Sequence, residues 1–183
     1  MFMQSTSIPD VKILNPKVFK DNRGFFVESF NARRFSDHGL PTEFRQDNVS
    51  YSEHVGTVRG LHFQRPPFAQ HKLVSVLRGS ILDIAVDLRR GSPSYGRHVA
   101  VKLFAEAANQ LFIPAAFAHG FCTLEPDTVV VYKVSEFYSA EHDDGIYWAD
   151  PALGIDWPVA EAAAILSDKD GKLPKLADFT GCF

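Results

Sequence analysis

Short apolar stretches alternate with polar turn residues along most of the chain. Within many stretches, hydrophobic and polar positions follow each other with a period of two, which is typical of half-buried β-strands. Gly, Pro, Asn and Asp recur between them at intervals of about ten residues, as in a sandwich or jelly roll. Strands are expected at residues 11–19, 24–30, 48–53, 57–64, 72–78, 80–87, 96–104, 109–113, 120–124 and 128–137.

Helical patterns are confined to two short segments. Residues 32–38 predict a short helix that ends at Gly39, with Pro41 beyond it. Residues 160–166 follow Pro158 and are rich in alanine, which favours a second helix near the C-terminus. We find no internal repeat and no linker, so residues 1–183 are expected to form one all-β domain with short peripheral helices.

Composition excludes several classes of protein. The chain has 183 residues, of which 45% are hydrophobic, and this is enough for one well-buried core. A net charge of -3 argues against a general nucleic-acid binder. Two cysteines provide neither a disulfide framework nor a metal-binding spacing. No apolar run reaches the ~18 residues of a membrane span, and no signal peptide is recognisable. We therefore expect a cytoplasmic protein without a membrane partner.

Two neighbouring strand segments carry groups suited to proton transfer. Side chains alternate along a strand, so His62 and Gln64 share one face, and Lys72 shares a face with Val74 and Val76. If both faces look into a barrel, a base and a cation meet in an apolar cavity, which suits proton abstraction next to a carbonyl. A lone strand histidine is more often a packed core or surface group, so both interpretations stay open for His62.

Two further residues extend this candidate site. Tyr132 stands in a strand that is too apolar to be exposed, and a buried phenol needs a partner for its hydroxyl. A cavity that holds a base supplies one, although a purely structural role is equally compatible. His119 follows a loop that begins at Pro114 and precedes Gly120, a placement that suits a side chain at a barrel mouth.

The order of these residues is similar to the metal-binding cupin pattern, with one important difference. In that pattern, two histidines one residue apart, a carboxylate and a later histidine hold a metal. Here Gln64 replaces the second histidine, and Lys72 brings an ammonium group that repels a divalent cation and cannot bind it. We therefore expect a cupin-like barrel without metal, in which the Lys72 ammonium provides the positive charge that a metal would supply.

Two arginines that precede glycines are candidates for phosphate binding. Arg23 and Arg59 are exposed turn residues in the simplest interpretation, and a bidentate clamp on phosphate oxygens in the functional one. Further hydrogen-bonding groups are supplied by Glu28, Gln46, Asp47 and Asn48. Asp170, by its local sequence alone, is a solvated acidic turn.

Motifs spread over nearly the whole chain resemble those of the dTDP-4-dehydrorhamnose 3,5-epimerases. The resemblance runs in order from about residue 8 to residue 175. The matching stretches are residues 21–30, 46–48, 58–64, 70–74, 113–121, 131–133, 138, 150–151, 155–158 and 166–170.

This resemblance implies a function, a fold and an assembly. The reaction is epimerisation at C3 and C5 of dTDP-4-dehydro-6-deoxy-D-glucose through an enolate, giving dTDP-4-dehydro-L-rhamnose for dTDP-L-rhamnose biosynthesis. The implied fold is a double-stranded β-helix, that is, a cupin-like jelly roll, in a homodimer that needs no metal or organic cofactor.

The resemblance also implies roles for individual residues. His62 is the general base and Asp170 completes a His–Asp dyad with it; Lys72 stabilises the enolate oxygen, and Tyr132 is the acid on the opposite sugar face. Tyr138 stacks on thymine. The other implied contacts to the nucleotide-sugar are Arg23, Phe26, Glu28, Gln46, Asp47, Asn48, Arg59, His119, Asp143 and Lys169, and those of residues 23–28 come from the partner subunit.

Two residues depart from the family pattern. Asp143 stands where a glutamate is frequent and has a shorter reach, and Ala116 replaces a frequent glycine before His119. Neither belongs to the implied proton-transfer set.

Three alternatives remain open. An epimerase that acts at a single carbon of another dTDP-4-keto-6-deoxysugar fits the same motifs. A metal-dependent cupin dioxygenase requires a complete set of metal ligands, and the presence of Gln64 and Lys72 argues against such a set. A non-catalytic sugar-nucleotide binding module has no reason to combine His62, Lys72 and Tyr132.

Overall fold

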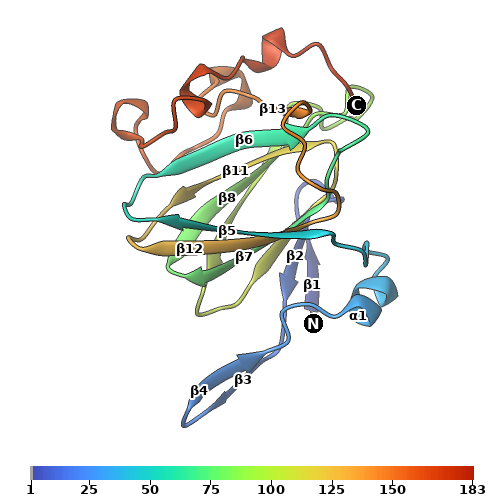
Figure 1. Ribbon diagram of the computed structural model, residues 1–183, viewed down its shortest axis with the longest axis vertical. Coiled ribbons are helices and arrows are strands. Elements are labelled where there is room, and N and C mark those ends of the chain that lie inside the picture. The colour runs from blue at the N-terminus through green and yellow to red at the C-terminus, as the bar shows by residue number, and fades with distance from the viewer. Residues whose placement is uncertain (1) are drawn as a thin grey trace.

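Two antiparallel β-sheets face each other in the computed structural model, which describes residues 2–183 (Figure 1). One sheet has six strands in the order β1-β2-β10-β7-β12-β5, and the other has five in the order β13-β6-β11-β8-β9. The strands are β1 Phe2–Ser5, β2 Lys12–Asn15, β3 Val18–Asp21, β4 Gly24–Val27, β5 Gln46–Ser52, β6 Val58–Gln64, β7 Lys72–Arg78, β8 Ser80–Asp87, β9 His98–Phe104, β10 Gln110–Ile113, β11 Phe117–Thr123, β12 Thr128–Val134 and β13 Asp143–Gly145.

Helical structure is short and lies outside the sheets. The α-helix α1 spans Ala32–Asp37, and the 3-10 helices are η1 Pro151–Leu153, η2 Glu161–Ala163, η3 Asp170–Lys172 and η4 Leu176–Asp178. The Asn31 side chain caps α1 by accepting from the Arg34 N–H. None of the helices formed by residues 2–183 has the length and apolar character needed to span a membrane.

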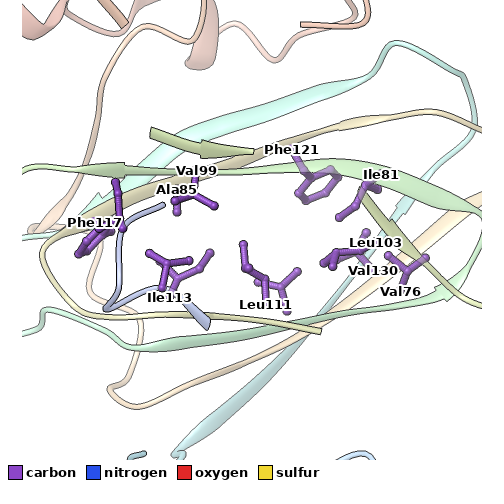
Figure 2. Close-up of a cluster of buried hydrophobic side chains, with 13 residues drawn as sticks. Val76, Ile81, Ala85, Val99, Leu103, Leu111, Ile113, Phe117, Phe121 and Val130 are labelled. Carbon is purple, nitrogen blue, oxygen red and sulfur yellow. The ribbon is translucent and has the colours of Figure 1, made fainter. Parts of the chain in front are cut away.

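The main core fills the space between the two sheets at one end of the sandwich. Figure 2 shows Leu111 and Val130 of the six-stranded sheet packing towards Ile81 and Phe121 of the five-stranded sheet. The period-two pattern explains this arrangement, because inward side chains of both sheets are apolar there. Burial of these side chains contributes the main stabilising free energy of the fold.

The expected all-β jelly roll is therefore confirmed, with corrections at both ends of the chain. The strand expected at residues 11–19 breaks at Pro16, which lacks the N–H that a continuous ladder needs, into β2 and β3. The helix expected at residues 160–166 is wrong. Only the single turn η2 forms, and Ile165 instead bridges to Thr57, since so short a segment does not repay helix nucleation. The strands β1 and β13 are not expected from the sequence pattern, and the single-domain organisation stays a prediction.

A hairpin formed by β3 and β4 projects away from both sheets (Figure 1). Three of its aromatic side chains, Phe19, Phe25 and Phe26, are at least half exposed. Exposed apolar side chains grouped on a projecting arm are typical of a surface that another protein covers.

Candidate active site

A cavity of about 420 Å³ lies between the sheets and adjoins the apolar core, since Phe121 belongs to both. Its polar lining comes from both sheets and from the C-terminal segment: Ser50, Thr57, Arg59, His62, Lys72, His119, Tyr132, Ser167, Lys169 and Asp170. A second cavity of about 280 Å³ adjoins it, because His62, Lys72 and Tyr132 line both. The second lining also includes Gln46, Asn48, Gln70, Tyr138 and Asp143.

A β-bulge brings two predicted site residues of β6 to the same cavity. Strict alternation would turn Arg59 and His62 to opposite faces of the strand. The pairing of β6 with β11 shifts between His119 and Phe121, so that three steps on β6 oppose two on β11. Gly60 lies in this bulge with a φ of 114°, and a Cβ there would stand 2.6 Å from the His119 carbonyl oxygen. The bulge therefore explains why the arginine and the histidine share one site.

His62 forms a hydrogen bond with Asp170. Nε2 of His62 lies 2.6 Å from Oδ1 of Asp170, and the backbone N–H of Gly60 donates to Oδ2 of the same carboxylate at 3.1 Å. Asp170 is only 3% exposed. Burial alone raises the pKa of Asp170, but the hydrogen bonds from His62, Gly60 and Ser167 outweigh it and hold this pKa below its ordinary value. Since the carboxylate is ionised, Nε2 carries the hydrogen, and Nδ1 is free to accept a proton.

Lys72 begins β7 and is a buried cation. Its Nζ donates to the backbone oxygen of His62 at 3.2 Å. Burial lowers the pKa of Lys72 to about 8, against the charges of Asp143 and Asp83, which raise it. The ammonium form therefore still predominates at neutral pH.

Tyr132 reaches the cavity from the sheet opposite His62. It lies on β12, directly across from Asn48 of β5, and its ring centroid is 6.4 Å from that of His119. Burial raises the pKa of the Tyr132 phenol, and so does Asp143, although Arg59 lowers it. The phenol thus keeps its proton at neutral pH and is a donor.

Hydrogen bonds hold the second cavity and its aromatic side chain in place. The amide of Gln64 donates to the backbone oxygens of Phe68 and Phe137 and accepts from the N–H of Ser139. Tyr138 is thereby fixed on both sides, and its hydroxyl donates to Asp143 at 3.1 Å. Gln64 therefore positions this loop, and both ends of its side-chain amide are already hydrogen-bonded within the protein.

Four predicted contact residues do not reach the cavities of their own chain. Asp47 alternates with Gln46 and Asn48, so it lies on the outer face of β5, where Lys133 donates to it at 2.9 Å. Asp47 therefore lines neither cavity of its own chain, and its contact with the nucleotide-sugar stays a prediction. Arg23, Phe26 and Glu28 lie on or beside the projecting hairpin: Arg23 pairs with Asp21, and Glu28 with Arg34.

One further functional candidate is not among the predicted site residues. Asp83 of β8 is completely buried behind the cavity, and its Oδ1 lies 2.7 Å from Nε2 of His119. A carboxylate in the otherwise apolar run of residues 81–86 was the signal that could have found it.

The residues 2–183 contain no group of three or more His, Cys, Asp or Glu side chains arranged to hold a metal ion. Ala116, which replaces a frequent glycine, has a φ of 70°, the left-handed region that favours glycine. The chain keeps the turn before β11 despite this substitution.

Comparison with known proteins agrees with this architecture. Residues 5–178 match the family model described as dTDP-4-dehydrorhamnose 3,5-epimerase. The chain is 50% identical to a dTDP-4-dehydrorhamnose 3,5-epimerase of Sinorhizobium fredii over 183 residues, which are 100% of this chain and 93% of the relative.

Solved structures share the fold. That of the epimerase RmlC from Legionella pneumophila, in complex with dTDP-4-keto-L-rhamnose, is 43% identical with a TM-score of 0.92, covering 97% of this chain and 94% of that one. ChmJ, a 3'-monoepimerase from Streptomyces bikiniensis in complex with dTDP-quinovose, is 34% identical with a TM-score of 0.89, covering 96% and 88%. The chain therefore belongs to the dTDP-4-dehydrorhamnose 3,5-epimerase family of isomerases.

Proposed function

We propose that this enzyme epimerises C3 and C5 of dTDP-4-dehydro-6-deoxy-D-glucose and delivers dTDP-4-dehydro-L-rhamnose to dTDP-L-rhamnose biosynthesis. One observation carries the proposal. An imidazole and a phenol line the same cavity from facing sheets, and a buried ammonium lines it with them. Inversion at carbon needs a base on one face of the sugar and an acid on the other, and this arrangement supplies both.

His62 is the base in this scheme. The hydrogens at C3 and C5 flank the C4 carbonyl, so Nδ1 takes one of them while the bonding electrons move to the carbonyl oxygen as an enolate. Asp170 orients the ring through Nε2 and stabilises the imidazolium that forms, as the carboxylate of a catalytic triad does. A positioned base contributes roughly 10²–10⁴-fold to the rate.

Lys72 stabilises the enolate oxygen. Its hydrogen bond to the His62 carbonyl fixes the ammonium beside the base before substrate arrives. A preorganised donor at a developing oxyanion contributes on the order of 3–4 kcal/mol in comparable sites.

Tyr132 supplies a different proton, its own, from the opposite face. Because burial keeps its phenol protonated, Oη donates to the enolate carbon, and the configuration inverts. The phenolate then regains a proton from solvent, and the His62 imidazolium releases the proton that it took, so that both groups are ready for the second carbon.

The nucleotide extends from the sugar into the adjoining cavity. Arg59 is oriented by Ser52 and the Tyr51 carbonyl, and it contacts the phosphates together with Lys169. Tyr138, which is 58% exposed, stacks on thymine. The ring is flanked by Gln46, Asn48 and Asp143, which provide hydrogen bonds at the rim.

The enzyme is a homodimer in this proposal. Its exposed hairpin places Arg23, Phe26 and Glu28 at the partner's site rather than at its own. The outer face of β5 supports an interface as well, since Val49 and Tyr51 are more than half exposed there. Sedimentation analysis should give twice the chain mass, and a monomer at micromolar concentration would contradict the dimer. Cytoplasmic location and independence of metals also stay predictions, the latter open to elemental analysis of active protein.

Proton NMR of product formed in deuterium oxide tests the function. We expect deuterium at both C3 and C5 and, with a partner reductase, dTDP-L-rhamnose. His62→Ala should abolish exchange at both carbons, whereas His38→Ala, a change of the exposed residue that follows α1, should not. Exchange at one carbon only would favour the alternative, a single-carbon epimerase, which the similarity to the 3'-monoepimerase ChmJ supports. Absence of exchange in the unaltered enzyme would refute the proposal.

A further inference from the structure

A second His–Asp pair lies at the same cavity as the first. His119 lines the cavity and is 5% exposed, while Asp83 behind it is 0% exposed. Nε2 of His119 lies 2.7 Å from Oδ1 of Asp83. Among residues 2–183, this is the only hydrogen bond that the His119 ring makes. None of the roles proposed above requires Asp83.

Hydrogen bonds only partly satisfy the carboxylate of Asp83. Its Oδ2 is buried with no hydrogen-bond partner among the residues that the structure describes. Asp87, four residues along the same strand and equally buried, accepts hydrogen bonds from Arg89, Ser92 and Ser94. A buried carboxylate without such partners is costly unless cations lie near it. Asp83 therefore depends on the cavity's own positive groups.

The positive groups beside Asp83 are those of the reaction site. Its charge raises the pKa of both Lys72 and His119, against burial, which is the larger effect and lowers both. The pKa of His119 is lowered overall, because burial outweighs the charge of Asp83, and Lys72 and His62 oppose a charge on the ring as well. The titratable groups at or beside this cavity, element by element, are His62 of β6, Lys72 of β7, Asp83 of β8, His119 of β11, Tyr132 of β12, Asp143 of β13, Asp170 of η3, and Arg59 and Lys169 at the rim.

We propose that Asp83 is a positioning residue of the epimerase: it accepts the Nε2 hydrogen of a neutral His119, and its charge keeps the Lys72 ammonium protonated at the enolate oxygen. His119 then offers Nδ1 as an acceptor to a sugar hydroxyl rather than a cation to phosphate. This inference rests on the proposed function, since Lys72 matters to it as the stabiliser of an enolate.

Substitution of Asp83 by asparagine tests the electrostatic part. Asp83→Asn keeps the shape but removes the charge, so Lys72 loses its proton at lower pH. We expect kcat/KM at pH 7 to fall on the order of 10- to 100-fold, mainly because His119 loses the carboxylate that orients its ring. The alkaline limb of the pH profile should move down by about one unit. Asp87→Asn removes an equally buried carboxylate of β8, so it should lower the unfolding midpoint without moving that limb.

An unchanged alkaline limb in folded Asp83→Asn protein, or an equal shift in Asp87→Asn, would overturn the proposal. A measurement on the unaltered enzyme covers the case in which Asp83→Asn does not fold. Nitrogen-15 NMR of labelled histidines, with His119 assigned by its loss in His119→Gln, should show a neutral ring protonated at Nε2 at pH 7. A ring protonated at Nδ1 alone, or at both nitrogens, would contradict it. This NMR measurement does not depend on turnover, so its failure is distinguishable from a failure of the proposed reaction.

Discussion

His62 and Asp170 are 108 residues apart in the chain, and Nε2 of the imidazole lies 2.6 Å from Oδ1 of the carboxylate. The contact depends on the C-terminal segment, which crosses β6 and buries Asp170 in η3. The same carboxylate accepts the Gly60 N–H from the bulge that directs Arg59 and His62 into one cavity. One buried charge thus links the dyad to the backbone that positions it.

The first prediction concerns pH and stability. The pKa of Asp170 is lower in the folded than in the unfolded chain, so its contribution is fully present above the unfolded pKa of about 3.9 and is lost as pH falls through the folded value. Asp170→Asn should therefore lower the unfolding free energy by about 1–3 kcal/mol at pH 6, and by less at pH 3. Urea unfolding at both pH values measures this difference. Asp168→Asn, an exposed neighbour, should change stability little at either, and equal losses in the two variants would contradict the prediction.

The second prediction separates the two faces of the sugar. Tyr132→Phe removes the acid but leaves the base, so deuterium should still enter at carbon while net inversion falls by about 10²-fold or more. Proton NMR in deuterium oxide follows both quantities in one sample. Equal loss of exchange and inversion would show that Tyr132 does something else. Tyr95→Phe, at a residue that lines neither cavity of the site, is the matched control.

The third prediction concerns the ammonium of Lys72. Because its pKa is about 8, kcat/KM should decrease as pH rises through 8, where the ammonium loses its proton. Lys72→Met should lower kcat on the order of 10²–10³-fold, the equivalent of about 3–4 kcal/mol. Lys102→Met, an exposed change on β9, should leave the rate and the alkaline limb as they are. A flat rate up to pH 10 in the unaltered enzyme would be incompatible with this role.

The fourth prediction concerns the bulge at Gly60. A Cβ there would stand 2.6 Å from the His119 carbonyl and 2.7 Å from Cα of Gly120, in a backbone with φ of 114°. Gly60→Ala should therefore lower the unfolding free energy by about 2 kcal/mol or more, and separate Arg59 from His62. Gly91→Ala, which meets nothing within 4 Å, should stay within about 0.5 kcal/mol of the unaltered protein. Thermal unfolding of both variants tests this, and similar midpoints would count against the steric argument.

Strand alternation explains what could be read from the sequence. It predicts which side chains share a face with His62 and which share one with Lys72, and the structure shows that both residues line one cavity. The same rule, applied to β5, turns Asp47 outward between Gln46 and Asn48. Strand alternation could not predict that Arg59 lines the same cavity as His62, because a bulge breaks the period of two at Gly60. The local sequence around Asp170 does not indicate that this residue contacts His62, because long-range packing of the C-terminal segment brings it to β6. Only the family resemblance implied that pairing.

The opposition of base and acid across the sugar is the central claim, and a crystal structure with dTDP-6-deoxyglucose tests it most directly. This analogue has a hydroxyl at C4 and cannot form an enolate, so it should remain intact in the cavity. We predict Nδ1 of His62 and Oη of Tyr132 on opposite faces of the ring, each within about 3.5 Å of C3 or C5, with Nζ of Lys72 beside the C4 oxygen. Both side chains on one face, or a sugar bound outside this cavity, would contradict the account.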